Sequence, residues 1–138
     1  MRPAIALGRR AIAALIAHPQ SMYWIDSHCH LDAPDFAHDR IEVLQRAQLQ
    51  GLAACVMPAV QAKDFEPLTE LARVTGQPYA LGIHPLYVPK AQESDLALLE
   101  KHLQEALSSH HEGTPKDPRL VALGEIGLDF WVPSLCEP

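Results

Sequence analysis

Side chains that can bind a metal ion or transfer a proton follow three of the four apolar stretches that the sequence predicts to be β-strands. His28 and His30 come after the first stretch, His84 after the third, and Glu125 after the fourth. In parallel α/β folds the active site forms at the carboxyl ends of the strands. The order of these residues along the chain therefore predicts one shared site at that edge of a parallel sheet.

The His28-Cys29-His30 triplet is the first candidate for metal binding. In an extended segment, residues two apart point to the same side, so the two imidazoles can hold one cation while Cys29 points the other way and packs. Imidazole is a good ligand for zinc and several other divalent transition metals. Two unrelated histidines in a turn are the alternative, and the position directly after a strand favours the metal site.

Glu125, His84 and Asp129 are the candidate catalytic residues. Glu125 lies in an otherwise apolar stretch between glycines, where its carboxylate can bridge two metal ions. His84 can face the same site, although a packed or hydrogen-bonded role stays open. Asp129 can accept a proton, position a water or hold a turn. Asp26 and Asp32 are candidates to accept a hydrogen bond from a ligating histidine.

Alternating strands and helices must position these residues. Apolar residues recur at helical spacing in three segments, with β-rich runs between them. Gly51 and Gly76 suit the ends of two helices, Ser94 suits the N-cap of the third, and Pro58 ends the second strand. This pattern predicts an α/β fold with a parallel sheet and crossover helices. The predicted strands are 23–25, 52–57, 79–83 and 120–123, the predicted helices are 37–50, 65–74 and 94–107, and an exposed polar loop is predicted over 110–118.

Composition narrows the functional classes. The chain has 138 residues, a size that fits one domain, and a net charge of −6, which argues against a broad basic face for nucleic acid. The three cysteines form no CxxC pair, and this indicates reduced thiols and a cytoplasmic location. No apolar run approaches the ~20 residues needed to cross a bilayer. We expect residues 1–21 to be an upstream extension, and we expect neither a membrane partner nor an obligate protein partner.

Three motifs in the chain resemble those of the TatD-type metal-dependent hydrolases. The first is Asp-Ser-His-Cys-His-Leu-Asp over 26–32, the second is Gly-Ile-His-Pro over 82–85, and the third is Ala-Leu-Gly-Glu-Ile-Gly-Leu-Asp-Phe over 122–130. The motifs occur in the family's order, and the resemblance runs from about Met22 to the end of the chain. A histidine pair after the first strand is shared with other metal-dependent barrels, whereas the third motif is what favours the TatD family.

The resemblance implies a TIM-type (β/α) barrel with one or two divalent cations, such as zinc, magnesium or manganese, and hydrolysis of phosphodiester bonds in DNA. It implies metal-ligand roles for His28, His30 and Glu125. A whole barrel of this type needs about 250 residues, so we expect 22–138 to correspond to the N-terminal half, with the first four strands and three helices. Hydrolysis of a small ester or amide, or a non-catalytic role for the chain, are the alternatives.

Overall fold

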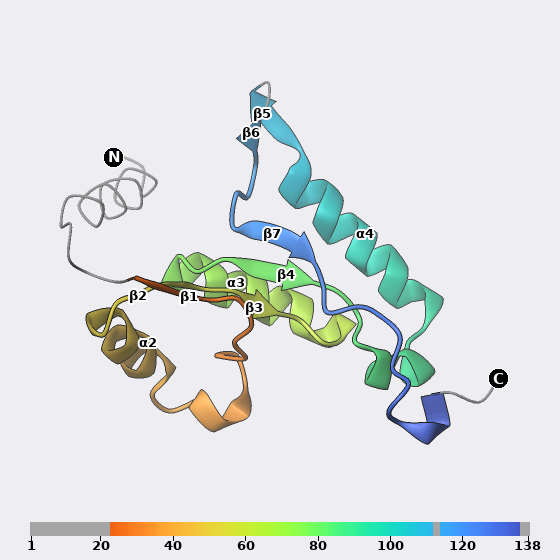
Figure 1. The fold of residues 1–138 in the computed structure, drawn as a ribbon. Coiled ribbons are helices and arrows are strands. Elements are labelled where there is room, and N and C mark those ends of the chain that lie inside the picture. Colours follow the sequence, from red (N-terminus) through yellow and green to blue (C-terminus); the bar gives the residue numbers. More distant parts are fainter. Residues whose placement is uncertain (1–22, 112–113, 136–138) are drawn as a thin grey trace.

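Short parallel strands alternate with helices in the computed structural model, which describes residues 23–111 and 114–135 (Figure 1). The predicted extension, 1–21, and Cys136 lie outside these ranges. The strands are β1 (Trp24–Asp26), β2 (Leu52–Cys55), β3 (Met57–Pro58), β4 (Tyr79–Leu81), β5 (Ser109–His111), β6 (Thr114–Pro115) and β7 (Leu120–Leu123). The α-helices are α2 (Arg40–Leu49), α3 (Phe65–Thr75) and α4 (Glu93–Leu107). Short 3-10 helices occupy Pro34–Phe36, Ala62–Asp64, Pro85–Lys90 and Pro133–Leu135.

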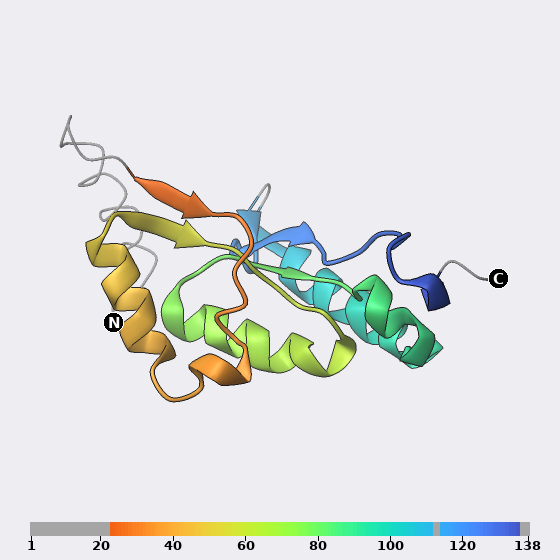
Figure 2. The ribbon, with the colours of Figure 1, turned by 60° about the horizontal axis from the view of Figure 1, so that its bottom comes forward.

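The strands that position the candidate residues are all parallel. β1 pairs with β2, and β4 lies between β3 and β7. The three helices lie along the same side of these strands (Figure 2), as successive crossovers of one hand require. The predicted α/β fold with crossover helices is therefore confirmed over the described residues.

The segment predicted as one strand over 52–57 is two strands with different partners. β2 pairs with β1, whereas β3 pairs with β4, and Val56 between them donates its amide to Asp26. The prediction that Pro58 ends the run is confirmed, because Pro58 is the last residue of β3. Met57 donates its amide to Pro78, the residue before β4, and Ala59 donates its amide to Ala80 in β4. Pro58 between them lacks an N–H at a position where the ladder needs none.

Helix α3 supplies the centre of the core. Its buried side chains pack against β3 and β4, and the predicted stop at Gly76 is confirmed because this residue adopts φ 73° and donates its amide to Ala72. A left-handed residue after the last turn is typical of glycine. The most deeply buried large side chains of the described residues are Tyr79, Phe65, Met57, Leu68, Leu81 and Cys55.

Two local predictions near α4 are wrong. The N-cap is Gln92 rather than Ser94, because Asp95 at the third helical position forms a reciprocal capping box with Gln92. The stretch predicted as a polar loop over 110–118 contains part of the β5–β6 antiparallel hairpin. Its strands are too short and too polar to give an alternating hydrophobic signal.

The outer strands are much less covered than the centre. All three residues of β1 are exposed, and Val121 and Leu123 of β7 are both about half exposed. The apolar stripe of α4 is likewise only partly covered, with Ala106 as its one buried residue. Within the described part of the chain, no helix is long and apolar enough to span a membrane.

Candidate metal centre

Three predicted ligands meet at the carboxyl ends of the strands. The Nε2 atoms of His28 and His30 are 3.2 Å apart, and each lies 3.5 Å from Oε2 of Glu125. The side chains of His28, His30 and Glu125 are 52%, 39% and 24% exposed, so an ion can reach them from solvent. Residues separated by almost one hundred positions therefore present three donor atoms to one point.

The spacing of these atoms fits a divalent cation. Nitrogen and oxygen ligands at ~2.0–2.2 Å from a tetrahedral ion lie about 3.3–3.5 Å apart, and the three separations of 3.2, 3.5 and 3.5 Å match this. Two imidazoles and a carboxylate are also a chemically suitable donor set for zinc and similar metals. The residues present can thus supply three ligands to one ion.

The cysteine between the histidines explains why both rings point to the same side. Cys29 packs against the core cluster, as predicted, and its amide donates to Val56. Burial is the main cause that raises the pKa of the Cys29 thiol, and burial also raises the pKa of the neighbouring Cys55 to about 12. Both thiols therefore stay protonated at neutral pH, which suits packing rather than metal binding.

The two predicted hydrogen-bond acceptors take different positions. Asp26 accepts from the backbone amide of His28 at 3.0 Å, so it stabilises the turn after β1. Asp32 lies beside His30, with 3.8 Å between its Oδ1 and the ring Nδ1. Its Oδ1 is buried without a hydrogen-bond partner, and burial is the main cause that raises the Asp32 pKa. An acceptor placed beside Nδ1 favours the tautomer that leaves Nε2 free to bind a metal.

The backbone of Glu125 is held by the two neighbouring strands. Gly124 donates its amide to Leu81, and Glu125 donates to Ala59, so the segment after β7 crosses over the end of β4; the peptide bond between the two residues is cis. This crossing passes directly over Gly82. A Cβ on Gly82 would lie 2.6 Å from the carbonyl carbon of Gly124 and 2.9 Å from the Glu125 nitrogen. The absence of a side chain at 82 is therefore what allows Glu125 to reach the histidines.

His84 lies beside the site and is also hydrogen-bonded, so its position fits both of the roles that the sequence left open. Its Nε2 lies 3.6 Å from Oε1 of Glu125, while its Nδ1 accepts the amide of Leu86 at 3.1 Å. Because Nδ1 is an acceptor, the proton of the neutral ring is on Nε2. His84 therefore presents an N–H donor toward the site and, in this tautomer, cannot bind a metal through Nε2.

Asp129 has a different environment from His28, His30, His84 and Glu125. Its Oδ1 accepts the amides of Trp131 and Val132 at 2.7 and 3.1 Å. Of the roles considered from the sequence, these hydrogen bonds fit the one in which Asp129 holds a turn. It does not belong to the group of His28, His30 and Glu125, whose ligand atoms lie within 4.8 Å of one another.

Gly82 is the residue of the site that sequence reasoning missed. The sequence shows it only as part of the Gly-Ile-His-Pro motif over 82–85, and its role depends on contact with a segment more than forty residues away. A glycine at a strand end next to a candidate ligand is the signal that could have found it, since glycine often marks a close approach of another backbone.

Comparison with known proteins identifies the family. The family model described as "TatD related DNase" matches residues 25–136. An uncharacterized metal-dependent hydrolase of Escherichia coli, YjjV, is 36% identical over 110 residues, which are 78% of this chain and 38% of the relative. The human protein named Deoxyribonuclease TATDN3 is 35% identical over 109 residues, or 77% of this chain and 38% of the relative.

The solved structure of the E. coli YjjV protein, described as a TatD homolog, superposes with a TM-score of 0.69 at 33% identity. The match covers 80% of this chain and 39% of that structure. The chain belongs to the TatD family, and the TIM-type arrangement of strands and helices predicted from the sequence is confirmed over the matched part. The aligned region spans about two fifths of the length of these relatives.

Proposed function

We propose that this chain takes part in divalent-metal-dependent hydrolysis of phosphodiester bonds in DNA. The observation that carries the proposal is the triangle of donor atoms from His28, His30 and Glu125, with separations of 3.2–3.5 Å. Relatives that share this part of the family are named metal-dependent hydrolases and, in vertebrates, deoxyribonucleases. The metal site and these names together support a hydrolase that acts on DNA.

In this proposal His28, His30 and Glu125 are the ligands that the chain supplies to one or two cations. A divalent cation at this position supplies Lewis acidity toward a phosphoryl oxygen and lowers the pKa of a nearby water. The negative charge of Glu125 holds the cation against the two neutral imidazoles. Because the chain as a whole is acidic, with a net charge of −6, attraction of the phosphate has to be local.

His84 supplies the hydrogen-bond donor of the proposed site. Its Nε2–H faces the same space as the Glu125 carboxylate, at 3.6 Å, and its ring is fixed by the Leu86 amide on Nδ1. A fixed N–H can donate to a phosphoryl oxygen as negative charge develops there. Asp129 is the third residue predicted to be catalytic, and its hydrogen bonds to Trp131 and Val132 support a positioning role for the turn after the third motif.

The first test removes a ligand while keeping its shape. Glu125→Gln should lower the affinity for Zn²⁺ by more than about 100-fold, since even changes outside the ligand set cost 10–100-fold, and should abolish metal-dependent cleavage of a labelled oligonucleotide. Glu105→Gln is the matched control, because Glu105 is an exposed carboxylate on α4 that pairs with Lys101. Isothermal titration calorimetry reports the metal affinity, and gel analysis reports the cleavage.

The outcomes separate the proposal from its alternatives. Unchanged Zn²⁺ affinity in Glu125→Gln contradicts the ligand assignment. Metal-dependent cleavage of a small carboxylic ester or amide, with DNA left intact, favours the other hydrolase chemistry. Metal binding without cleavage of any of these substrates favours a non-catalytic role for the chain.

A further inference from the structure

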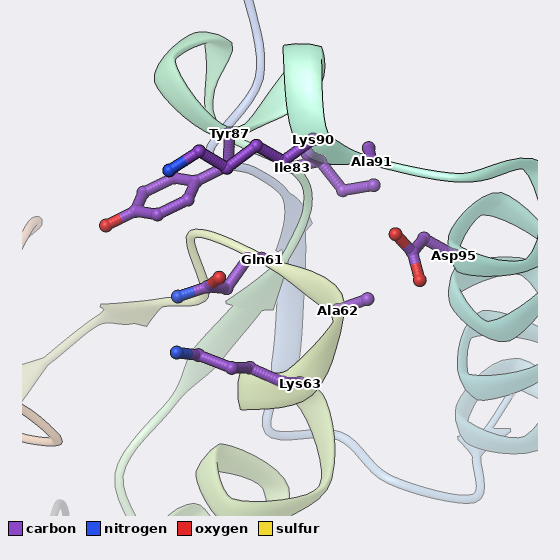
Figure 3. Close-up of a pocket in the computed structure, with 8 residues that line it drawn as sticks. All are labelled: Gln61, Ala62, Lys63, Ile83, Tyr87, Lys90, Ala91 and Asp95. Atoms are coloured by element: carbon purple, nitrogen blue, oxygen red, sulfur yellow. The ribbon is translucent and has the colours of Figure 1, made fainter.

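A cavity of about 160 Å³ lies between the connection after β3 and the connection after β4 (Figure 3), and Ile83 in its lining directly precedes His84 in the sequence. This is room for several waters at about 30 Å³ each, and so for a phosphate group. Four polar side chains gather their ends on one side of it, whereas Asp95 lies on the opposite side. The four are Gln61, Lys63, Tyr87 and Lys90.

The two lysines of this cavity lack ionic partners among the described residues. In that part of the chain neither Lys63 nor Lys90 has a carboxylate within 4.0 Å, whereas each described arginine contacts a carboxylate or a backbone carbonyl. Asp95 is the acidic residue of the lining, and its Oδ2 accepts the amide of Gln92 in the capping box. The cavity therefore has two positive charges on one wall that no described side chain neutralises, in a chain whose net charge is −6.

The polar wall of the cavity is connected to the metal centre through adjacent rings. The ring of Tyr87 stands edge-on to the ring of His84, with 6.4 Å between the centroids. His84 in turn lies 3.6 Å from Glu125. Tyr87 packs against the core cluster, so the ring that carries its hydroxyl is held in place. A ligand that occupies both places must carry two groups of negative charge a short distance apart.

We propose that the side chains of Gln61, Lys63, Tyr87 and Lys90 bind a backbone phosphate of a nucleic-acid strand, next to the phosphate held at the metal centre. This inference rests on the proposed function and defines its substrate as a strand with at least two phosphates. Two lysines supply charge, and the Gln61 amide and Tyr87 hydroxyl supply hydrogen bonds, as contacts to a phosphate backbone do. These contacts carry no base specificity, so the site accepts any sequence.

The test compares two double variants with the same change of charge. Lys63→Met with Lys90→Met removes the cavity cations, and Lys101→Met with Lys116→Met removes two lysines elsewhere, on α4 and before β7. Binding of a fluorescein-labelled ten-residue oligothymidine is followed by anisotropy, with EDTA present, over a series of salt concentrations. EDTA prevents cleavage, so the measurement is independent of any hydrolysis.

Loss of the lysine contacts to this one phosphate should reduce the slope of log K against log salt by about 0.7, the contribution of one neutralised phosphate on a single strand. We expect the cavity variant to show this reduction and at least tenfold weaker binding at low salt, with the control variant close to wild type. Equal weakening in both variants, or none in either, overturns the proposal. Failure of the proposed function is read separately, from Zn²⁺ titration and the cleavage of DNA.

Discussion

Polar side chains collect at both ends of the parallel strands, and the two groups differ in how completely they are hydrogen-bonded. The amino-end cluster consists of Tyr79, Asp117 and Arg119. Four donors reach the single carboxylate of Asp117, at 2.8–3.1 Å, from the Tyr79 hydroxyl and from the backbone and side chain of Arg119. The cluster leaves no acceptor capacity for a ligand, which is the arrangement expected of a group that stabilises the fold.

The carboxyl-end cluster consists of His28, His30, His84 and Glu125. Its side chains lie 3.2–3.6 Å apart, and the three contacts to Glu125, at 3.5–3.6 Å, are longer than good hydrogen bonds. The Glu125 carboxylate thus meets three imidazoles without forming a good hydrogen bond to any of them. Convergence of polar groups is therefore not sufficient to indicate a binding site. The carboxyl end differs from the amino end because its residues keep atoms that can still bind a ligand.

The largest expected effect comes from the glycine beneath Glu125. In Gly82→Ala the new methyl would lie 2.6–2.9 Å from the backbone of Gly124 and Glu125, so the segment that carries the ligand must move. We expect Zn²⁺ affinity to fall more than about 100-fold, the loss expected when a ligand itself is displaced, and stability to fall by about 1–3 kcal/mol through overpacking. Calorimetric titration and urea unfolding measure the two quantities.

Gly76→Ala is the matched control for this substitution. Gly76 has φ 73°, and a Cβ added to it would meet nothing within 4 Å; the residue ends α3 near the amino ends of the strands. A left-handed conformation should cost alanine about 1 kcal/mol of stability, with metal affinity unchanged. Equal losses of metal affinity in both variants would contradict a specific role for Gly82.

The next effect concerns the amino-end cluster and is one of stability alone. Asp117→Asn should lower the free energy of unfolding by about 2 kcal/mol, because hydrogen bonds to a charged group contribute about 1.5–3 kcal/mol and the amide nitrogen of asparagine must face a donor. Metal affinity should stay at the wild-type value. Urea unfolding of both proteins at pH 7, followed by tryptophan fluorescence, measures the difference; a variant as stable as wild type would contradict it.

The same pair of proteins gives a test by pH. Burial raises the pKa of Asp117, but the bonds from Arg119 outweigh this effect, so the pKa lies below its usual value. A carboxyl group with a lowered pKa stabilises the fold above its unfolded pKa, which is about 4, and this stabilisation is lost as the pH falls through the folded value. The stability difference between wild type and Asp117→Asn should therefore be constant near neutrality and shrink below about pH 4.

The sequence predicted the parts of the fold that depend on local patterns. Helix α3 has a regular apolar stripe and Gly76 at its end, and both features are local. The split at Val56 was not predictable in this way, because an apolar run gives no information about which strand pairs with each half. The cap of α4 was misassigned because serine is a common N-cap, whereas the reciprocal bonds of Gln92 and Asp95 decided the position.

The candidate site divides in the same manner. The convergence of His28, His30 and Glu125 follows from their places after parallel strands, so it could be inferred from order alone. Two other features depend on how the connections after the strands pass one another in space. They are the contact of Gly82 with the Glu125 backbone and the common orientation of Lys63 and Lys90. These connections have no repeating pattern from which their paths could be predicted.

The smallest expected effect comes from Asp32, where the same change from Asp to Asn is made at the other end of the strands. Asp32 has a buried Oδ1 without a hydrogen-bond partner, 3.8 Å from Nδ1 of His30. Asp32→Asn should weaken Zn²⁺ binding by about tenfold, the lower end of the range for groups that orient a ligating histidine. The free energy of unfolding should not decrease, since burial disfavours the ionised carboxylate and its Oδ1 gains no hydrogen bond there.

Asp32→Asn and Asp117→Asn should therefore have opposite effects. The first should lower metal affinity without lowering stability, and the second should lower stability without changing metal affinity. Titration calorimetry and urea unfolding on the two variants give four measurements that decide the comparison. If Asp32→Asn unfolds the protein more easily while its Zn²⁺ affinity is unchanged, the carboxylate supports the loop after β1 instead of orienting His30. In that case the atoms left able to bind a metal at the carboxyl end are those of His28, His30 and Glu125 alone. The tautomer of His30 is then set without Asp32.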